Sequence, residues 1–231
     1  MLLLLPVFLL AALDWYALAT GRTRLGYFSK PAVILALIAW VWVIGDLPTI
    51  YYSDAGMIKF IVFGLGLSLA GDVLLMLPER RFGIGLTFFL LAHLCYIYGL
   101  TGRRIPDYAY APAILLAVLV LLVALRLIVS AVRMLRENGT NHILLPLAMY
   151  LLIISGTVFA AISRLLERQW PDQWGYLVSV GALMLYVGDI LLAKRRYLHE
   201  TTYDRLLSRI LHHLGQIGIA VATTYAYLTY L

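Results

Sequence analysis

Long runs of apolar residues, separated by short polar stretches, follow one another along the whole chain. A helix that crosses a bilayer needs about 17–25 mostly apolar residues, and eight runs fit that length. They are Leu2–Ala19, Pro31–Leu47, Gly56–Leu77, Gly83–Thr101, Tyr108–Val129, Ile143–Ser163, Gly175–Ala193 and Leu207–Leu231. The pattern predicts an all-α, polytopic membrane protein with eight transmembrane helices in a single domain, residues 1–231. Pro31 is expected in the first turn of its helix, where a missing N–H is tolerated.

The composition indicates a membrane protein rather than a soluble one. The chain has 231 residues, of which 63% are hydrophobic and 13% charged, whereas soluble domains are about 45–50% apolar and 25% charged. The net charge of +6 would suggest nucleic acid in a soluble protein. Here the enrichment of Lys and Arg in cytoplasmic loops explains it, so no nucleic-acid partner is expected. Thirteen of the 18 Lys and Arg residues lie in or beside the loops after odd-numbered helices, which predicts cytoplasmic loops there and non-cytoplasmic termini.

A short motif occurs twice in the chain. Gly-Asp-Val-Leu-Leu begins at Gly71, and Gly-Asp-Ile-Leu-Leu begins at Gly188, 117 positions later. Each copy is followed by two adjacent arginines and then by a predicted helix that contains histidine. The copies lie in the third and seventh predicted helices, which run in the same direction because four crossings separate them. The repeat therefore predicts two parallel four-helix halves, related by an axis along the membrane normal.

The aspartates of this motif, Asp72 and Asp189, are the leading candidates for catalysis. An ionised carboxylate costs roughly 2.5–3.5 kcal/mol at the centre of a bilayer on insertion scales, so such residues are usually functional. Each lies five residues or so before the cytoplasmic end of its helix, which places both about 7–8 Å below the same surface. If they face each other, one can be protonated while the other is ionised, as acid and base chemistry requires. The alternative is that each hydrogen-bonds a neighbouring helix.

Further polar residues near these aspartates have both a functional and a structural interpretation. Ser68, one turn before Asp72, either donates a hydrogen bond to it or lets helices approach closely. His93, near mid-membrane with Tyr96 on its face, either supports the site or makes one interhelical hydrogen bond. Lys30 either anchors its helix at the interface or pairs with a phosphate or an aspartate.

The last helix and the loop before it add weaker candidates. His213 and Gln216 share a face of that helix, and His213 is more often a structural residue at such a position. Arg195 and Arg196 chiefly determine topology, although a phospholipid headgroup would meet them. A metal site needs three ligands, but HExxH and HxxxH spacings are missing from the sequence and Cys95 is the single cysteine. We therefore expect no metal, no other cofactor and no internal disulfide.

An ordered set of motifs spans nearly the whole chain. It comprises Phe28-Ser29-Lys30-Pro31, Ser68-Leu-Ala-Gly71-Asp72-Val-Leu-Leu75, Phe82…Gly85, Phe89…Ala92-His93…Tyr96, Gly181-Ala182…Gly188-Asp189-Ile-Leu-Leu-Ala193 and Gln216. Together these motifs resemble the YhhN-like lysoplasmalogenase family. One position departs from that pattern, because Gly188 stands where a serine is expected before the second aspartate.

The resemblance implies hydrolysis of the vinyl ether bond of lysoplasmalogens, which gives a fatty aldehyde and glycerophosphocholine or glycerophosphoethanolamine. It also implies that Asp72 and Asp189 are catalytic, that His93 and Lys30 line the site, and that the substrate is a lysophospholipid in the membrane. That membrane would be the cytoplasmic membrane of a bacterium or the endoplasmic reticulum of a eukaryote. The oligomeric state is left open.

Two other functions fit the same residues. Parallel repeats with paired intramembrane acids are also typical of an ion- or proton-coupled transporter, in which Asp72 and Asp189 would bind the ion. A related lysolipid hydrolase, acting on another bond, is the third interpretation. Formation of aldehyde from lysoplasmalogen in detergent, where there is no membrane gradient, distinguishes vinyl ether hydrolysis from transport and from hydrolysis of another lysolipid bond.

Overall fold

The computed structural model describes residues 2–46, 56–77, 82–101, 109–137, 144–167, 170–195 and 201–229. These residues form α-helices and short 3-10 segments, and the described ranges contain no strand. The α-helices are α1 (Leu5–Ala19), α2 (Thr23–Ile44), α4 (Gly56–Met76), α5 (Phe82–Thr101), α6 (Tyr110–Glu137), α7 (Leu144–Ile162), α8 (Asp172–Arg195) and α9 (Thr202–Thr229). The prediction of an all-α fold is confirmed.

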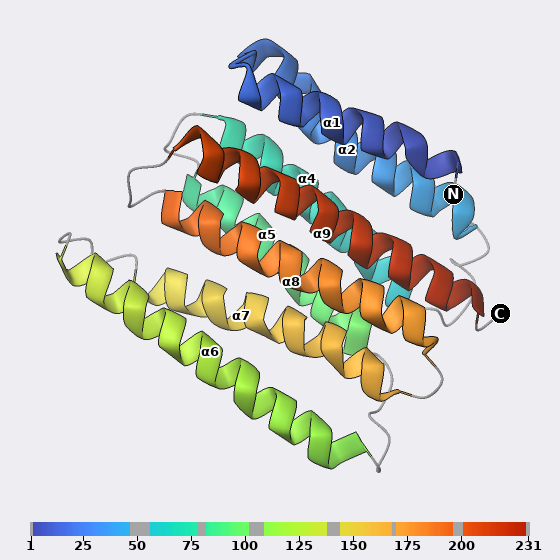
Figure 1. Cartoon of the computed structure of the whole chain (residues 1–231), viewed down its shortest axis with the longest axis vertical. Helices are drawn as coiled ribbons and strands as arrows, with labels where there is room; N and C mark the ends of the chain where they lie inside the picture. Colours follow the sequence, from blue (N-terminus) through green and yellow to red (C-terminus); the bar gives the residue numbers. More distant parts are fainter. Residues whose placement is uncertain are drawn as a thin grey trace.

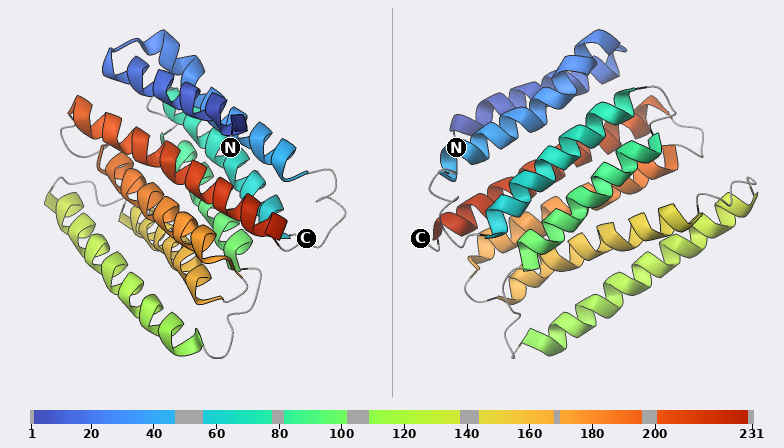
Figure 2. Two further views of the ribbon diagram at one scale, coloured as in Figure 1. Left: turned by 45° about the vertical axis from the view of Figure 1, so that its right-hand side comes forward. Right: turned by 180° about the vertical axis from the view of Figure 1, so that it is seen from behind.

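The helices pack side by side in one elongated bundle (Figure 1). Helices α4, α5, α8 and α9 form its centre, and the α8–α9 and α4–α5 pairs make the most extensive contacts. The α1–α2 pair lies on one side of this centre, and α7 followed by α6 lies on the other (Figure 2). The two chain ends are marked at the same end of the bundle (Figure 1), so the turn between α1 and α2 and the start of α9 lie at the opposite end.

Six helices are long and apolar enough to cross a membrane: α2, α4, α5, α6, α7 together with η5 (Ser163–Leu166), and α8. The prediction of a polytopic membrane protein therefore agrees with the structure. Helix α1 has 15 residues, fewer than the 17 or so that a span usually needs, and α9 is not among the six. The count of eight spans remains a prediction for these two helices. Many large apolar side chains of α6 are exposed, including Leu115, Leu119 and Leu122, as expected for a face in contact with lipid.

Helix α2 begins at Thr23, eight residues before the predicted start at Pro31. Gly21 adopts a φ of +68°, which glycine reaches without steric strain, so the chain turns sharply and enters the next helix at once. Pro31 consequently lies inside α2, where it removes one backbone hydrogen bond. The earlier start matters for function because it turns Ser29 and Lys30, both buried, toward the interior of the bundle.

Helix α9 begins at Thr202, five residues before the predicted start at Leu207. Its first turn is held by a reciprocal cap, in which the backbone N–H of Asp204 donates to Thr201 Oγ1 (3.1 Å) and that of Thr201 donates to Asp204 Oδ2 (3.0 Å). Such a cap stabilises a polar first turn that apolar patterning does not detect. Helices α6 and α8 likewise extend beyond their predicted ends, to Glu137 and from Asp172.

Glycines bring α4 against α5 and α8 against α9 at matching positions. A Cβ on Gly64 would lie 3.1 Å from the carbonyl oxygen of Ala92, and one on Gly71 would lie 3.1 Å from that of Gly85. In the second pair, a Cβ on Gly181 would lie 3.1 Å from the oxygen of Gly215, and one on Gly188 would lie 3.1 Å from that of Ser208. Both motif aspartates follow directly after such a contact. The contact also explains Gly188, because a serine there would press its Cβ against α9.

Candidate functional site

The first aspartate of the repeat is paired with a lysine from the neighbouring helix. Lys30 Nζ of α2 lies 2.7 Å from Asp72 Oδ1 of α4, and the side chains are 10% and 2% exposed. Of the two roles expected for Lys30, the structure therefore shows the pairing with an aspartate. A buried ion pair of this kind is strongly destabilised when one partner is removed, because the other charge then remains buried alone.

The second aspartate contacts two imidazoles. His93 Nε2 of α5 lies 2.7 Å from Asp189 Oδ2 of α8, and His212 Nδ1 of α9 lies 3.3 Å from Asp189 Oδ1. The other ring nitrogen of His93 is 2.9 Å from Thr157 Oγ1 of α7. When Asp189 is ionised it can only accept hydrogen bonds, so the two imidazole nitrogens that face it then act as donors. Four helices are thus joined at Asp189, which is completely buried.

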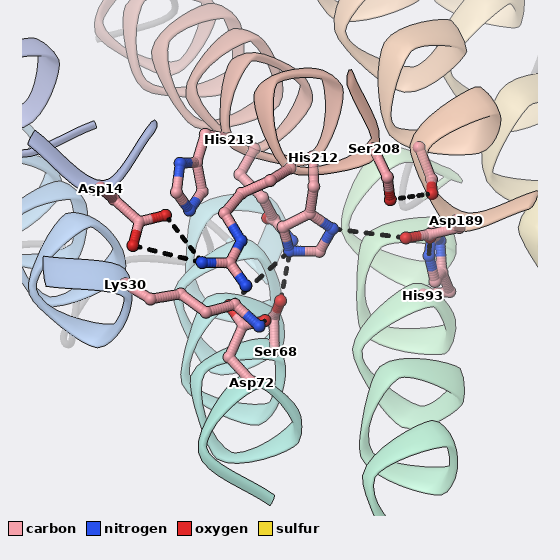
Figure 3. A network of polar contacts seen from close by, with 12 residues as sticks. Asp14, Lys30, Ser68, Asp72, His93, Asp189, Ser208, His212 and His213 are labelled. Atoms are coloured by element: carbon pink, nitrogen blue, oxygen red, sulfur yellow. Dashed lines mark hydrogen bonds and ion pairs between the residues drawn. The ribbon is translucent and has the colours of Figure 1, made fainter. Parts of the chain in front are cut away.

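His212 lies between the two aspartates (Figure 3). Its Nδ1 faces Asp189, and its Nε2 is 3.8 Å from Asp72 Oδ2. The imidazole separates the carboxylates, so the sequence-based picture of two facing carboxylates is replaced by a row of carboxylate, imidazole and carboxylate. Phe89 of α5 packs edge-on against the His212 ring, with ring centroids 5.3 Å apart, which holds the ring in this orientation.

Two polar atoms of this row lack a hydrogen-bond partner among the described residues, namely Asp72 Oδ2 and His212 Nε2. Both residues line a small cavity of about 30 Å³, together with Lys30, Phe89, Leu192, Arg205, Ser208 and Arg209. A water molecule needs roughly 10–15 Å³ of such space and two or more polar partners. The cavity therefore has room for one or two waters, or for a small reacting group, beside the two atoms best placed to exchange protons with it.

A second hydrogen-bonded chain lies one turn deeper. Gln216 Nε2 of α9 donates to Ser68 Oγ (2.8 Å), and Tyr96 Oη donates to Gln216 Oε1 (2.6 Å). All three side chains are buried. The structure therefore places Ser68, Tyr96 and Gln216 next to one another, and the hydrogen bond from Ser68 to Asp72 stays a prediction. This chain fixes α4, α5 and α9 directly beneath the aspartates.

His213 points away from the aspartates, although it is adjacent to His212 in sequence. Its Nδ1 accepts a hydrogen bond from Trp15 Nε1 (3.1 Å), and the two rings stack with centroids 6.3 Å apart. His213 therefore occupies the position expected of a structural residue, in contact with Trp15. Arg196 lies outside the described residues, and so does the side chain of Arg195, the last residue of α8.

Asp14 of α1 forms a further buried contact beside this cluster. Ser29 Oγ donates to Asp14 Oδ1 (2.9 Å), and Arg209 Nη1 of α9 lies 3.3 Å from Asp14 Oδ2. These contacts hold α1 and α2 against α9, and Arg209 and Lys30 both line the water-sized cavity.

His212 is the residue that sequence reasoning missed. The signal was present, because Ser208, His212 and Gln216 are spaced four residues apart and therefore share a face of α9. The three residues form a polar stripe along a buried part of that helix. Among the described residues, no group of three or more His, Cys, Asp or Glu side chains is arranged to hold a metal ion.

Comparison with known proteins gives one match. Searches of curated proteins and of solved structures return nothing similar to this chain. The model of the YhhN family matches residues 25–223, a range that contains Lys30, Asp72, His93, Asp189 and His212. That range covers most of the 231 residues and agrees with the resemblance noted from the motifs. The chain therefore belongs to the YhhN family.

Proposed function

We propose that this protein hydrolyses the vinyl ether bond of lysoplasmalogens, giving a fatty aldehyde and glycerophosphocholine or glycerophosphoethanolamine. Membership of the YhhN family supports a lysoplasmalogenase-type function. The observation that carries the proposal is the position of His212, which contacts Asp189 and faces Asp72 across a water-sized cavity. This arrangement supplies a proton donor and a proton acceptor at one buried place.

The reaction has two chemical requirements. A proton must be delivered to the β-carbon of the vinyl ether, which produces an oxocarbenium ion, and water must then add to the carbon that bears the oxygen. The resulting hemiacetal releases the glycerol oxygen as an alcohol and becomes the aldehyde. General acid and base groups within hydrogen-bond reach accelerate such proton transfers by roughly 10²–10⁴, and a carboxylate beside the cation stabilises it.

The residues of the row suit these steps. Asp189 holds His212 through its Nδ1–H, so the proton donor would be the imidazolium form of His212, whose Nε2–H points into the cavity. Asp72 Oδ2 faces the same cavity and would stabilise the oxocarbenium ion and accept a proton from the attacking water. The proton taken up by Asp72 then passes to His212 Nε2, which restores the imidazolium and the ionised Asp72. Lys30 holds Asp72 in place through its other oxygen, and His93 does the same for Asp189.

The position of the cluster suits a single-chain lipid. It lies toward the end of the bundle where α1 ends and α9 begins, the end that the distribution of Lys and Arg assigns to the cytoplasm. A lysolipid in the inner leaflet would have its headgroup at this surface and its sn-1 bond a short way below.

Product analysis with purified protein in detergent tests the proposal. Choline and ethanolamine lysoplasmalogens should yield one aldehyde for each molecule of glycerophosphodiester, while ester lysophospholipids should not react. If neither lysoplasmalogen gives aldehyde, the proposed reaction is wrong.

A proton-coupled transporter is the second candidate, and the buried ion pair of Lys30 with Asp72 is the observation that favours it. Such pairs occur along ion pathways in membrane proteins. Transport needs two compartments, so turnover in detergent supports the hydrolase. Proton-dependent uptake into sealed vesicles, without aldehyde formation, would support the transporter instead.

A further inference from the structure

A second and larger cavity adjoins the water-sized one. Its volume is about 460 Å³, which lies within the range of roughly 300–1,000 Å³ typical of small-molecule sites. Its walls come from the end of α1, the first turns of α2, the ends of α4 and α8 and the start of α9. Lys30, Leu192, Arg205 and Arg209 line both cavities, so the larger one leads directly to Asp72 and His212.

The charged side chains that line the larger cavity are all cationic. They are Arg22, Lys30, Arg205 and Arg209, and no acidic side chain is among the described lining residues. We name this cavity the cationic vestibule. Lys30 belongs to α2, Arg205 and Arg209 belong to α9, and Arg22 directly precedes α2. Both helices begin earlier than the apolar pattern predicted. We propose that the cationic vestibule binds the phosphate group of a phosphate-bearing lipid and so places the lipid's sn-1 bond at His212. This inference rests on the proposed function for the identity of that bond.

Burial increases from the vestibule toward the water-sized cavity. Arg22 is exposed, the side chain of Arg209 is 18% exposed, that of Lys30 is 10% exposed and that of Asp72 is 2% exposed. An anion that enters therefore meets positive charge in surroundings with progressively less water, where the attraction between opposite charges is stronger. A ligand without an anionic group gains no such attraction along this path.

The vestibule's arginines are suited to phosphate. A guanidinium presents five N–H donors in a planar fork that matches two oxygens of a phosphate. Arg209 Nη1 donates to Asp14 Oδ1 (3.4 Å) and Oδ2 (3.3 Å). These contacts fix the side chain through one nitrogen and leave the other donors of the guanidinium for a ligand. Apolar side chains complete the walls, among them Leu18, Leu75 and Leu192, and these favour a lipid over free inorganic phosphate.

The spacing along α9 fits a glycerophospholipid. At 1.5 Å per residue, Arg209 lies about 4.5 Å and Arg205 about 10 Å from His212 along the helix axis. In a lysoplasmalogen, five bonds separate the phosphorus from the vinyl ether oxygen. A phosphate held between Arg205 and Arg209 therefore puts the vinyl ether close to the water-sized cavity, at the level of His212 and Asp72.

Kinetics with two substrates test this inference. One is a choline lysoplasmalogen and the other is the matching 1-alkenylglycerol, which has the same vinyl ether but no phosphate. We expect Arg205→Gln and Arg22→Gln each to lower the ratio of kcat/KM for the two substrates at least tenfold, through a higher KM for the lysoplasmalogen. Arg133→Gln is the matched control, since Arg133 is an exposed cation of α6 outside the vestibule, and should leave the ratio unchanged. An unchanged ratio in Arg205→Gln and Arg22→Gln would overturn the inference.

A binding measurement separates this inference from the proposed reaction. The ligands are an alkyl-ether lysophosphatidylcholine, glycerophosphocholine and inorganic phosphate, measured by calorimetry with the wild type and Arg22→Gln. We expect the lysolipid to bind at least tenfold more weakly to the variant, whether or not vinyl ethers are cleaved. If inorganic phosphate binds the wild type as tightly as the lysolipid does, the ligand is a free phosphate and the lipid is refuted. If no phosphate-bearing ligand binds while lysoplasmalogen is still cleaved, the vestibule inference fails and the proposed function stands.

Discussion

Replacing His212 by glutamine should abolish most of the activity, whereas the same change at His213 should have little effect. His212 Nδ1 contacts Asp189 at 3.3 Å, and its Nε2 lines the water-sized cavity 3.8 Å from Asp72 Oδ2. Removing a positioned acid or base lowers the rate by roughly 10²–10⁴, which corresponds to about 3–5 kcal/mol of transition-state stabilisation. His213 instead accepts a hydrogen bond from Trp15, which glutamine can also accept, so we expect a loss below tenfold.

The assay is aldehyde release from choline lysoplasmalogen by purified protein in detergent, with kcat and KM determined for each variant. Thermal unfolding of both variants should be measured alongside, because His212 and His213 are both buried and either change can loosen the bundle. Comparable unfolding temperatures with a loss of kcat in His212→Gln alone would support the assignment. Full turnover by folded His212→Gln, or equal losses in the two variants, would refute it.

Three further predictions concern the residues around His212. Asp72→Asn and Asp189→Asn should each lower kcat at least 100-fold in folded protein, and aldehyde release at the wild-type rate by either would contradict an acid–base role. Lys30→Met should lower the unfolding temperature, because it leaves the buried charge of Asp72 unpaired, at a cost of about 3–5 kcal/mol. Lys30→Met combined with Asp72→Asn should recover stability without activity. An unfolding temperature that does not recover in the double variant would contradict a stabilising ion pair. Gly215→Ala should destabilise the α8–α9 contact by about 1–3 kcal/mol, since its Cβ would lie 2.7 Å from the Leu185 nitrogen, whereas Gly66→Ala meets nothing within 4 Å and serves as the control. Equal unfolding temperatures for the two alanine variants would argue against close packing there.

Apolar run length predicted the fold class and the central parts of the helices, because a bilayer imposes both length and composition on a span. It failed where polar residues extend a helix. Thr201 and Asp204 cap α9, and Gly21 lets α2 begin early. Hydropathy does not register such local hydrogen bonds and backbone angles. These additional turns supply Lys30 and Arg205, so the part of the fold that sequence patterning missed is part of the candidate site.

The repeat identified Asp72 and Asp189 as a pair, and their buried positions in one polar cluster agree with that interpretation. The sequence did not reveal how they are connected. Residues adjacent on a helix point about 100° apart, so choosing between His212 and His213 required knowing which face of α9 meets α8. Gly188 and Gly215 determine that face through close backbone contacts, which a pattern of apolar residues does not encode.

The glycine contacts also support two related halves. Gly64 and Gly71 of α4 correspond to Gly181 and Gly188 of α8, each 117 positions later. Their contact residues on α5 and α9 correspond with an offset of 123, since Ala92 matches Gly215 and Gly85 matches Ser208. The two helix pairs therefore pack in the same register, and six additional residues lie in the connection between α8 and α9.

This register shows that the halves are not chemically equivalent. With an offset of 123, Phe89 of α5 is the position equivalent to His212 of α9. The two rings pack against each other at the centre of the bundle. One half therefore contributes an imidazole and the other an apolar ring at the same position. Asp189 is contacted by His93 and His212, whereas Asp72 pairs with Lys30 and faces His212 at 3.8 Å. If His212 carries the proton, Asp189 is the residue that orients it and Asp72 is the one that meets water and substrate, so exchanging the partners of the two aspartates should not preserve activity.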